Sequence, residues 1–331
     1  MTTLPTHMRA VVLDRYEAGG WRVEPQHPVP TPGPFDLLIR VRASPLNPSD
    51  LSFMIGQYGI RKPLPVVPGF EAAGQVVAVG ERLDPADWIG RRVACFAGGG
   101  DGTYAEYMAT NAALALPLPD HIDDEAGAMM LVNPLTAWAL IDMAQTAGAS
   151  AVVQTAAASA LGQMLRRFGE AHGLAVINIV RRAEQLEMLR AGGAEHVLDS
   201  SSRTFDADLR ERSRSLNAVI GFDAVGGSLT DRVLRAMPNG SRMVVYGGLE
   251  GTPVSIGVDQ LIFRDKRVEG FWLSTWMPAQ PDRVREAWRA VTGDTDSFRS
   301  DVRARCPLEQ FGAAVEQYAA QMSGGKVLIV P

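Results

Sequence analysis

The sequence predicts an α/β protein with two domains, the first rich in β-strands and the second built on a doubly wound parallel sheet. From Met8 to Pro119, short apolar runs are separated by Gly and Pro, which is typical of all-β structure. From about residue 121, apolar runs alternate with helical runs, a rhythm typical of a parallel sheet covered by helices on both faces. A length of 331 residues also favours two domains over a single core.

The first domain is expected over residues 1–120 and 275–331. Its strands are expected at 8–13, 36–44, 71–80, 91–98 and 102–110. The Pro-rich stretch 25–34 predicts an extended connector, and 55–69 predicts a long irregular loop. Because long loops in compact domains often carry function, 55–69 is a candidate location for a site.

The second domain is expected over residues 121–274. A strand at 151–156 is followed by a helical run at 160–173, and strands and helices then alternate at 175–182, 183–193, 196–201, 205–214, 218–227, 229–237 and 241–248. This is the pattern of a Rossmann-like domain. The strand 267–273 is expected to close the edge of the sheet, after which the chain returns to pack on the first domain.

Composition excludes several classes of protein. Hydrophobic residues make up 46% and charged residues 21%, an ordinary globular balance, and the net charge of -5 argues against a nucleic-acid partner. Cys95 and Cys306 are the only cysteines, too few for a disulfide framework, which favours a reducing compartment. Neither a signal peptide at the start nor an apolar window of roughly 18 to 20 residues is found. A cytoplasmic protein without a membrane partner is expected.

The turn after the first strand of the second domain is a candidate phosphate site, because helix N-termini favour anions. It reads Thr155-Ala156-Ala157-Ala158-Ser159-Ala160-Leu161-Gly162, a degenerate glycine fingerprint in which only the last Gly is kept. The alternative is a small-residue turn that serves tight helix-sheet packing alone. The strand-turn-helix context favours the phosphate site.

The end of the next strand carries Arg181 and Arg182, about twenty residues beyond the turn. An NAD enzyme has Asp or Glu at this corner for the ribose hydroxyl, whereas an NADP enzyme has Arg for the 2′-phosphate. The alternative is a solvated, charged corner at the start of a helix. The position in the βαβ unit favours NADPH as the cofactor.

No metal is expected. A zinc alcohol dehydrogenase needs Cys and His ligands for its catalytic metal and four close cysteines for a structural one. The corresponding segments read Pro45 to Asp50 and Pro68 to Glu71, and the five histidines do not cluster with the cysteines.

Without a metal, a phenol can polarise a carbonyl or deliver a proton. Tyr58, in the loop segment Gly56-Gln57-Tyr58-Gly59, is the candidate, against the alternative of a loop Tyr that only packs its ring. Trp272 and Trp276 are candidates for an apolar substrate channel, although aromatic residues at a strand end also serve cores and dimer interfaces.

Several stretches resemble the medium-chain dehydrogenase/reductase superfamily over nearly the whole chain. They are NPSDLSFMIGQYG, VPGFEAAGQVVAVG, VNPLTAW, INIVRR, GAEHV, YGG, LIFRDKRVEGFWLSTW and GGKVLIV. Within the superfamily they resemble the zinc-free branch of trans-2-enoyl-thioester reductases and bacterial NADPH:quinone oxidoreductase-like proteins. The resemblance implies a GroES-like catalytic domain followed by a Rossmann-like NADPH domain.

The resemblance also implies roles for particular residues. Tyr58 matches the proton donor of the enoyl reductases, and Asn47 and Thr136 would lie near the nicotinamide. The other implied cofactor contacts are Asn133, Ser159, Ala160, Leu161, Gly162, Arg181, Arg182, Tyr246, Gly247, Gly248, Leu249, Phe271, Trp272, Leu273, Ser274 and Lys326. Tyr58, Trp272 and Trp276 are the expected substrate residues, and the strand RVEGFWL resembles one through which relatives form homodimers.

The chain departs from the family pattern at two places. Ala158 and Ala160 stand where the family usually has an Asn and a Gly in the pyrophosphate turn. At the end of the next strand, this chain has Arg181-Arg182-Ala183, whereas the enoyl reductases have a sequence similar to Arg-Asp-Arg.

The expected function is NADPH-dependent hydride transfer to the β-carbon of an α,β-unsaturated thioester or ketone. Two alternatives are an NADPH:quinone oxidoreductase, which needs no proton donor, and a non-catalytic NADPH-binding sensor or scaffold.

Overall fold

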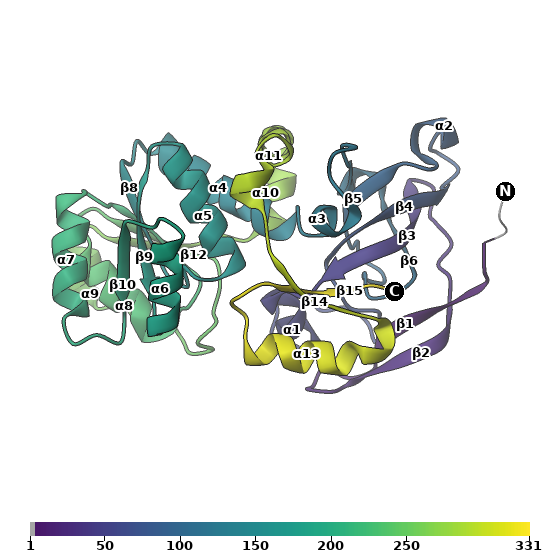
Figure 1. The fold of residues 1–331 in the computed structure, drawn as a ribbon, viewed down its shortest axis with the longest axis horizontal. Helices are drawn as coiled ribbons and strands as arrows, with labels where there is room; N and C mark the ends of the chain where they lie inside the picture. The colour runs from purple at the N-terminus through teal and green to yellow at the C-terminus, as the bar shows by residue number, and fades with distance from the viewer. Residues whose placement is uncertain (1–3) are drawn as a thin grey trace. The chain divides into compact units, whose positions relative to one another are not determined.

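The computed structural model describes residues 4–331, which form two compact units (Figure 1). The first unit runs to Val132 and resumes at Ser300, and the second spans Asn133–Arg299. The expected α/β class with a β-rich part and a parallel-sheet part is confirmed.

The first unit contains a hairpin of β1 (His7–Leu13) and β2 (Trp21–Pro28) and a larger sheet. The larger sheet has the order β14-β15-β3-β4-β5-β7, with β6 also paired to β3. Its strands are β3 (Asp36–Pro45), β4 (Glu71–Val79), β5 (Arg92–Phe96), β6 (Tyr107–Asn111), β7 (Ala115–Pro117), β14 (Val302–Cys306) and β15 (Lys326–Ile329). The helices are α1 (Pro48–Met54), α2 (Pro85–Trp88), α3 (Asp124–Ala128) and α13 (Phe311–Ala320), with short 3₁₀ turns η1 (Ala112–Leu114) and η2 (Leu308–Gln310).

The core of this unit follows from strand alternation. In β3, Leu37, Ile39 and Val41 point to one face, where they are buried against Val76 and Val93. Side chains of a strand alternate between faces, so the intervening arginines of β3 are exposed. A second core cluster beneath α1 and α13 includes Phe53, Tyr104 and Phe311.

The second unit is built on a six-stranded sheet in the order β10-β9-β8-β11-β12-β13, and every pair in it is parallel. Its strands are β8 (Ala151–Gln154), β9 (Ala175–Val180), β10 (His196–Asp199), β11 (Ile220–Asp223), β12 (Arg242–Val245) and β13 (Arg267–Gly270). Its helices are α4 (Val132–Thr146), α5 (Ala160–Ala171), α6 (Ala183–Ala191), α7 (Phe205–Ser215), α8 (Gly227–Ala236), α9 (Val258–Ile262), α10 (Leu273–Ala279), α11 (Pro281–Gly293) and α12 (Thr295–Phe298).

Two of the elements differ from the expected ones, and one expected loop is confirmed. The first residues of the stretch 25–34 belong to β2, because this strand pairs with β1 as far as Pro28. The expected edge strand 267–273 ends at Gly270, and Leu273 begins α10. The loop 55–69 contains no helix or strand among the residues that the structure describes, as expected; its one isolated bridge joins Leu13 and Val66.

The unit boundaries also differ from the expected 120/121 and 274/275. Residues 121–132 belong to the first unit, because α3 packs on β3, β4 and β5. Helices α10 to α12 belong to the second unit: the rings of Phe168 on α5 and Phe298 on α12 are 4.7 Å apart, and Arg167 donates to the Ser297 carbonyl at 3.0 Å. Only the chain from Ser300 returns to the first unit.

Candidate cofactor and catalytic sites

The turn between β8 and α5 lies where the strand order of the sheet reverses. Chain connections from β8 lead to β9 on one side, whereas β11 is its neighbour on the other side. In open parallel sheets, ligands bind outside the carboxyl ends of the strands at such a reversal. The predicted pyrophosphate turn therefore occupies the ligand-binding position of this fold.

The local geometry explains why one glycine is kept in this turn. Ser159 is the N-cap of α5, and its Oγ accepts a hydrogen bond from the Gly162 backbone N–H at 3.0 Å. A Cβ on Gly162 would lie 2.7 Å from the Ala156 carbonyl oxygen and 2.8 Å from the Ala157 Cα, so a side chain cannot fit. Ala156 itself has a φ of 48°. The turn is therefore drawn tightly against the helix start.

Four groups of predicted cofactor residues share the carboxyl edge of this sheet. They follow β8, β9, β12 and β13 and comprise Ser159–Gly162, Arg181 with Arg182, Tyr246–Leu249 and Phe271–Ser274. Parallel strands end on the same side of their sheet, which brings segments distant in sequence to one edge.

The two arginines after β9 lie at the surface. Arg182 is the N-cap residue of α6, and its Nε is 3.2 Å from the Glu184 carboxylate. The Arg181 backbone N–H donates to Gln185 Oε1 at 3.4 Å. Both side chains are exposed, as a phosphate-binding role requires.

Trp276 lies among aromatic neighbours in the second unit. Its ring centroid is 6.3 Å from that of Trp138 and 6.2 Å from that of Phe271. It also lines a hollow of about 540 Å³ with Arg242 and Arg283. Because Arg242 is the first residue of β12, this hollow lies toward the amino ends of the strands, away from the pyrophosphate turn.

In the first unit, the loop that carries Tyr58 is held at several points. The Tyr58 ring lies 5.1 Å from the Phe70 ring. Tyr16 donates through its hydroxyl to the Lys62 carbonyl and accepts from the Lys62 N–H, both at 2.8 Å. The Lys62 ammonium donates to the carbonyls of Gly98 and Gly100 at 2.8 and 2.6 Å. Burial lowers the pKa of Lys62.

Asn47 and Lys326, both predicted cofactor residues, meet in the first unit. Lys326 Nζ donates to Asn47 Oδ1, and Asn47 Nδ2 donates to Glu71 Oε1 at 2.8 Å. All three side chains are buried. Burial lowers the pKa of Lys326 and raises that of Glu71, while their mutual attraction opposes both shifts.

Asp50 lies beside this cluster at the start of α1. Its Oδ2 accepts from the Asn47 N–H at 2.8 Å, which forms half of a capping box. Desolvation raises the pKa of Asp50 to about 7, with a further contribution from the charge of Glu71. The protonation state of Asp50 therefore changes near neutral pH.

Glu71 and Asp50 are the site residues for which sequence reasoning assigned no role. Both stand in motifs that the resemblance includes, NPSD and VPGFE. For Glu71, a carboxylate at the start of a largely apolar strand was the available signal, because such a group is buried only with partners.

The positions that correspond to zinc ligands in zinc alcohol dehydrogenases are occupied by residues of other types. Residues 68–71 place the Phe70 ring against Phe53 and Tyr58. Within residues 4–331, no group of three His, Cys, Asp or Glu side chains is arranged to hold a metal ion. No helix in the same range is both long enough and apolar enough to cross a membrane.

Comparisons with known proteins agree with this architecture. The family of the alcohol dehydrogenase GroES-like domain matches residues 33–120, and that of the zinc-binding dehydrogenase matches residues 160–293. The β-rich unit is thus GroES-like, and the parallel-sheet unit is the Rossmann-like part of a dehydrogenase. The chain belongs to the medium-chain dehydrogenase/reductase superfamily.

Individual relatives are oxidoreductases by name. The human mitochondrial enoyl-[acyl-carrier-protein] reductase is 34% identical over 298 residues, which cover 85% of this chain and 77% of the human protein. A Mesorhizobium loti structure assigned as an NADPH:quinone reductase is 36% identical with a TM-score of 0.91, covering 100% of both chains. A mycobacterial structure in complex with NADPH is 26% identical with a TM-score of 0.84, over 98% of this chain and 100% of the other.

Proposed function

We propose that the protein is an NADPH-dependent, zinc-independent reductase that transfers hydride to the β-carbon of an α,β-unsaturated thioester or ketone, with Tyr58 as proton donor. The observation that carries this proposal is Tyr58 in a loop anchored through Tyr16 and Lys62. A phenol held in place by its loop can act at one fixed position. The relatives named as enoyl reductases support the reaction class.

The second unit fits NADPH. The turn of small residues before α5 places the N-terminus of this helix at the carboxyl edge of the sheet, where the helix dipole favours an anion such as a pyrophosphate. Exposed Arg181 and Arg182 at the end of β9 suit a 2′-phosphate, which carries the charge that guanidinium groups bind in bidentate fashion. The NADPH-bound mycobacterial relative supports the same cofactor.

Held by Ser159–Gly162 and the arginines after β9, NADPH would supply the hydride that the substrate's β-carbon accepts, and the electron pair of the double bond would move toward the carbonyl oxygen. The Tyr58 hydroxyl then stabilises the substrate enolate and delivers the proton to its α-carbon. Solvent returns the proton to the phenolate. The sum is one hydride and one proton added across the double bond.

Quinone reduction is the second candidate, and the Mesorhizobium loti structure favours it. A quinone accepts the hydride on an apolar ring, and its oxygen takes a proton from water. This reaction therefore needs the same cofactor residues but not Tyr58.

A single experiment separates the candidates. We would follow NADPH oxidation by absorbance with a panel of enoyl-thioesters, enones and quinones, comparing wild type with Tyr58→Phe. Enoyl turnover that falls about 10²- to 10⁴-fold in the variant supports the proposal, because that is the usual contribution of a positioned acid. Quinone turnover that survives the change favours the second candidate, and NADPH binding without turnover indicates a sensor.

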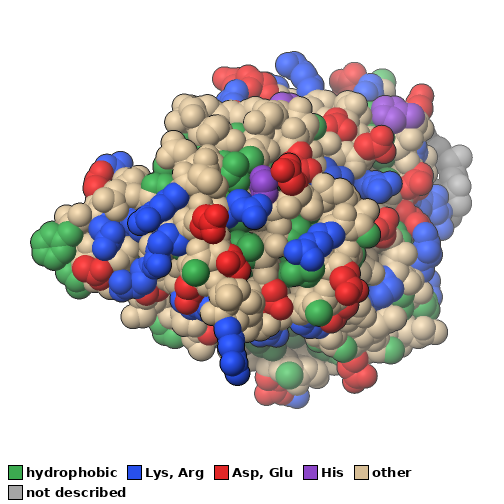
Figure 2. Space-filling view, turned by 60° about the vertical axis from the view of Figure 1, so that its left-hand side comes forward, with side chains coloured by type: hydrophobic (Ala, Val, Ile, Leu, Met, Phe, Trp, Pro, Cys, Tyr) green, Lys and Arg blue, Asp and Glu red, His purple; other side chains and the backbone are tan. Residues whose placement is uncertain are grey.

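Partners and location are proposed with the reaction. We expect a small-molecule or acyl-thioester substrate and a cytoplasmic protein. Figure 2 shows Lys and Arg side chains interspersed with Asp and Glu over the face it presents, which does not suit a polyanion such as nucleic acid.

We also propose a homodimer through the edge of the second unit's sheet. All four residues of β13 are exposed, and an unpaired edge strand presents free backbone groups to a second copy. Beside it, Val258, Ile262 and Phe263 are 64%, 66% and 79% exposed. Large exposed apolar side chains gathered on α9 and at its C-cap are typical of an interface.

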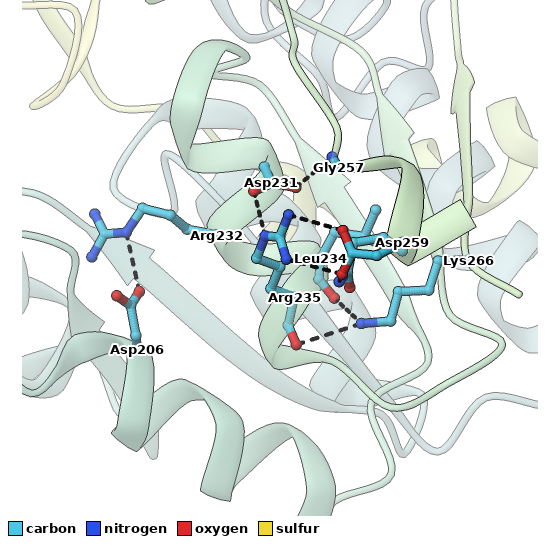
Figure 3. A network of polar contacts seen from close by, with 9 residues as sticks. Asp206, Asp231, Arg232, Leu234, Arg235, Gly257, Asp259 and Lys266 are labelled. Atoms are coloured by element: carbon cyan, nitrogen blue, oxygen red, sulfur yellow. Dashed lines mark hydrogen bonds and ion pairs between the residues drawn. The ribbon is translucent and has the colours of Figure 1, made fainter. Parts of the chain in front are cut away.

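A polar network holds this surface to α8, as Figure 3 shows. Arg235 bridges Asp231 at 2.6 Å and Asp259 at 3.2 Å, so one guanidinium ties α9 to α8. The Lys266 ammonium donates to the Leu234 carbonyl and, at 3.0 Å, to the Met237 carbonyl at the C-terminal end of α8. The proposed interface is therefore fixed before a partner arrives.

A further inference from the structure

We infer that Glu71 is a positioning residue for the nicotinamide end of the proposed site: its carboxylate holds Asn47 and the backbone of Leu131 and Val132 in one fixed arrangement. This inference rests on the proposed use of NADPH. It adds a residue to which neither the family motifs nor the named relatives give a role.

The first support is that Glu71 uses both of its oxygens. Oε1 accepts from Asn47 Nδ2 at 2.8 Å. Oε2 accepts from the Val132 N–H at 2.8 Å and from the Leu131 N–H at 3.3 Å. Hydrogen bonds to an ionised carboxylate are about twice as strong as neutral ones, so these three donors are firmly held.

The second support is where those donors lead. Val132 is the first residue of α4, and the predicted cofactor residues Asn133 and Thr136 follow within little more than one turn. The first backbone N–H groups of a helix have no partner within the helix, and Glu71 supplies one at Val132. Asn47 in turn accepts from Lys326 Nζ. Two predicted cofactor residues of the first unit, Asn47 and Lys326, are thus linked to this carboxylate, which also holds the chain immediately before Asn133.

The third support is burial. Glu71 is 1% exposed, so it cannot touch a substrate or cofactor itself. Its effect must pass through the groups that it holds. A buried carboxylate also needs a compensating charge, and the attraction of Lys326 lowers the pKa of Glu71 against the effect of burial.

Glu71→Gln is the test variant because it keeps the shape and removes one acceptor. A glutamine offers a single oxygen, so either Asn47 Nδ2 or the backbone N–H groups must face an NH₂ group. We expect the affinity for NADPH, measured by fluorescence titration of the folded protein, to fall at least about tenfold. We also expect Leu131 and Val132 to exchange their amide hydrogens faster in the cofactor-free protein.

Glu106→Gln is the matched control. Glu106 likewise accepts a backbone N–H, that of Arg9 at 2.7 Å, and pairs with the Arg9 guanidinium in the same unit. It lies outside the predicted site, so its variant should bind NADPH like wild type. Glu71→Asp keeps the charge on a shorter side chain and should recover part of the affinity.

The outcomes are distinct. If Glu71→Gln is folded by circular dichroism and binds NADPH as tightly as Glu106→Gln, Glu71 is only structural and the inference fails. A wild type that binds NADPH but reduces no enoyl substrate overturns the proposed reaction, while the affinity ratio still decides the role of Glu71. Absence of NADPH binding in wild type overturns both.

Discussion

Thr155 Oγ1 donates a 2.6 Å hydrogen bond to Asp223 Oδ1 and accepts one at 2.9 Å from the Ala224 N–H. The pair joins the carboxyl ends of β8 and β11, the two strands that flank the strand-order reversal. Both side chains are buried, so this bond has no competition from water. The base of the pyrophosphate turn is therefore cross-linked by side chains.

Thr155→Val should destabilise the protein by about 1–3 kcal/mol, because it leaves the buried Ala224 N–H without an acceptor. Urea unfolding measures this difference. Thr155→Ser keeps the hydroxyl and should recover most of the loss; a Thr155→Val variant as stable as wild type would mean that the hydrogen bond contributes nothing to stability.

Gly162→Ala should cost about 1–3 kcal/mol in unfolding free energy, since the new methyl group meets backbone atoms that cannot move aside. It should also weaken NADPH binding by displacing the start of α5. Gly293→Ala is the control, because a Cβ there meets nothing within 4 Å. Equal stability of the two variants would contradict the close packing of the turn.

Arg181→Ala and Arg182→Ala should each weaken NADPH binding about 10- to 100-fold, the value of one charged hydrogen bond of about 1.5–3 kcal/mol. Binding of NADH, which lacks the 2′-phosphate, should be unchanged. Titration of both cofactors gives the ratio. Arg190→Ala on α6 is the control. If Arg181→Ala and Arg182→Ala weakened NADH binding as much as NADPH binding, the arginines would act through packing and not by binding the 2′-phosphate.

Asp50→Asn should change how stability depends on pH. The pKa of Asp50 is raised from 3.8 to about 7, so its contribution to stability is fully present below its ordinary pKa and is lost as pH rises through 7. The variant has no such loss. Its stability relative to wild type should therefore increase from about pH 4 to about pH 7 and stay level above that in urea unfolding. A constant difference would mean that Asp50 does not titrate in this range.

Ile262→Asp with Phe263→Asp should dissociate the proposed dimer. Burial of one such apolar side chain is worth about 1.5–3 kcal/mol, so the dissociation constant should rise at least about tenfold. Sedimentation velocity at micromolar concentration measures it. Phe35→Asp changes a 57% exposed Phe of the first unit and should leave the association unchanged. A monomeric wild type would refute the interface.

Sequence reasoning predicted the parallel sheet and its order of elements because apolar runs and helical periodicity are local signals. The family resemblance implied cofactor contacts at residues 181–182 and 246–249, and the parallel sheet brings both segments to one edge because its strands end on the same side. Sequence reasoning missed the roles of Glu71 and Asp50, because a buried carboxylate is recognised by partners that the fold brings from residues 131, 132 and 326. It also assigned α10 to α12 to the first domain instead of the second unit. Contacts such as that of Phe168 with Phe298 join residues far apart in the sequence, so the local sequence pattern does not indicate them.

The path of the chain determines which unit can complete its fold first during synthesis on the ribosome. The second unit is continuous from Asn133 to Arg299, whereas the first receives β14 and β15 only from the segment after Ser300. Until Lys326 leaves the ribosome, Glu71 and Asn47 lack their cationic partner, and β3 lacks its neighbour β15. The nascent GroES-like unit is thus incomplete while the Rossmann-like unit can already close, so the last unit to begin folding is the first to finish.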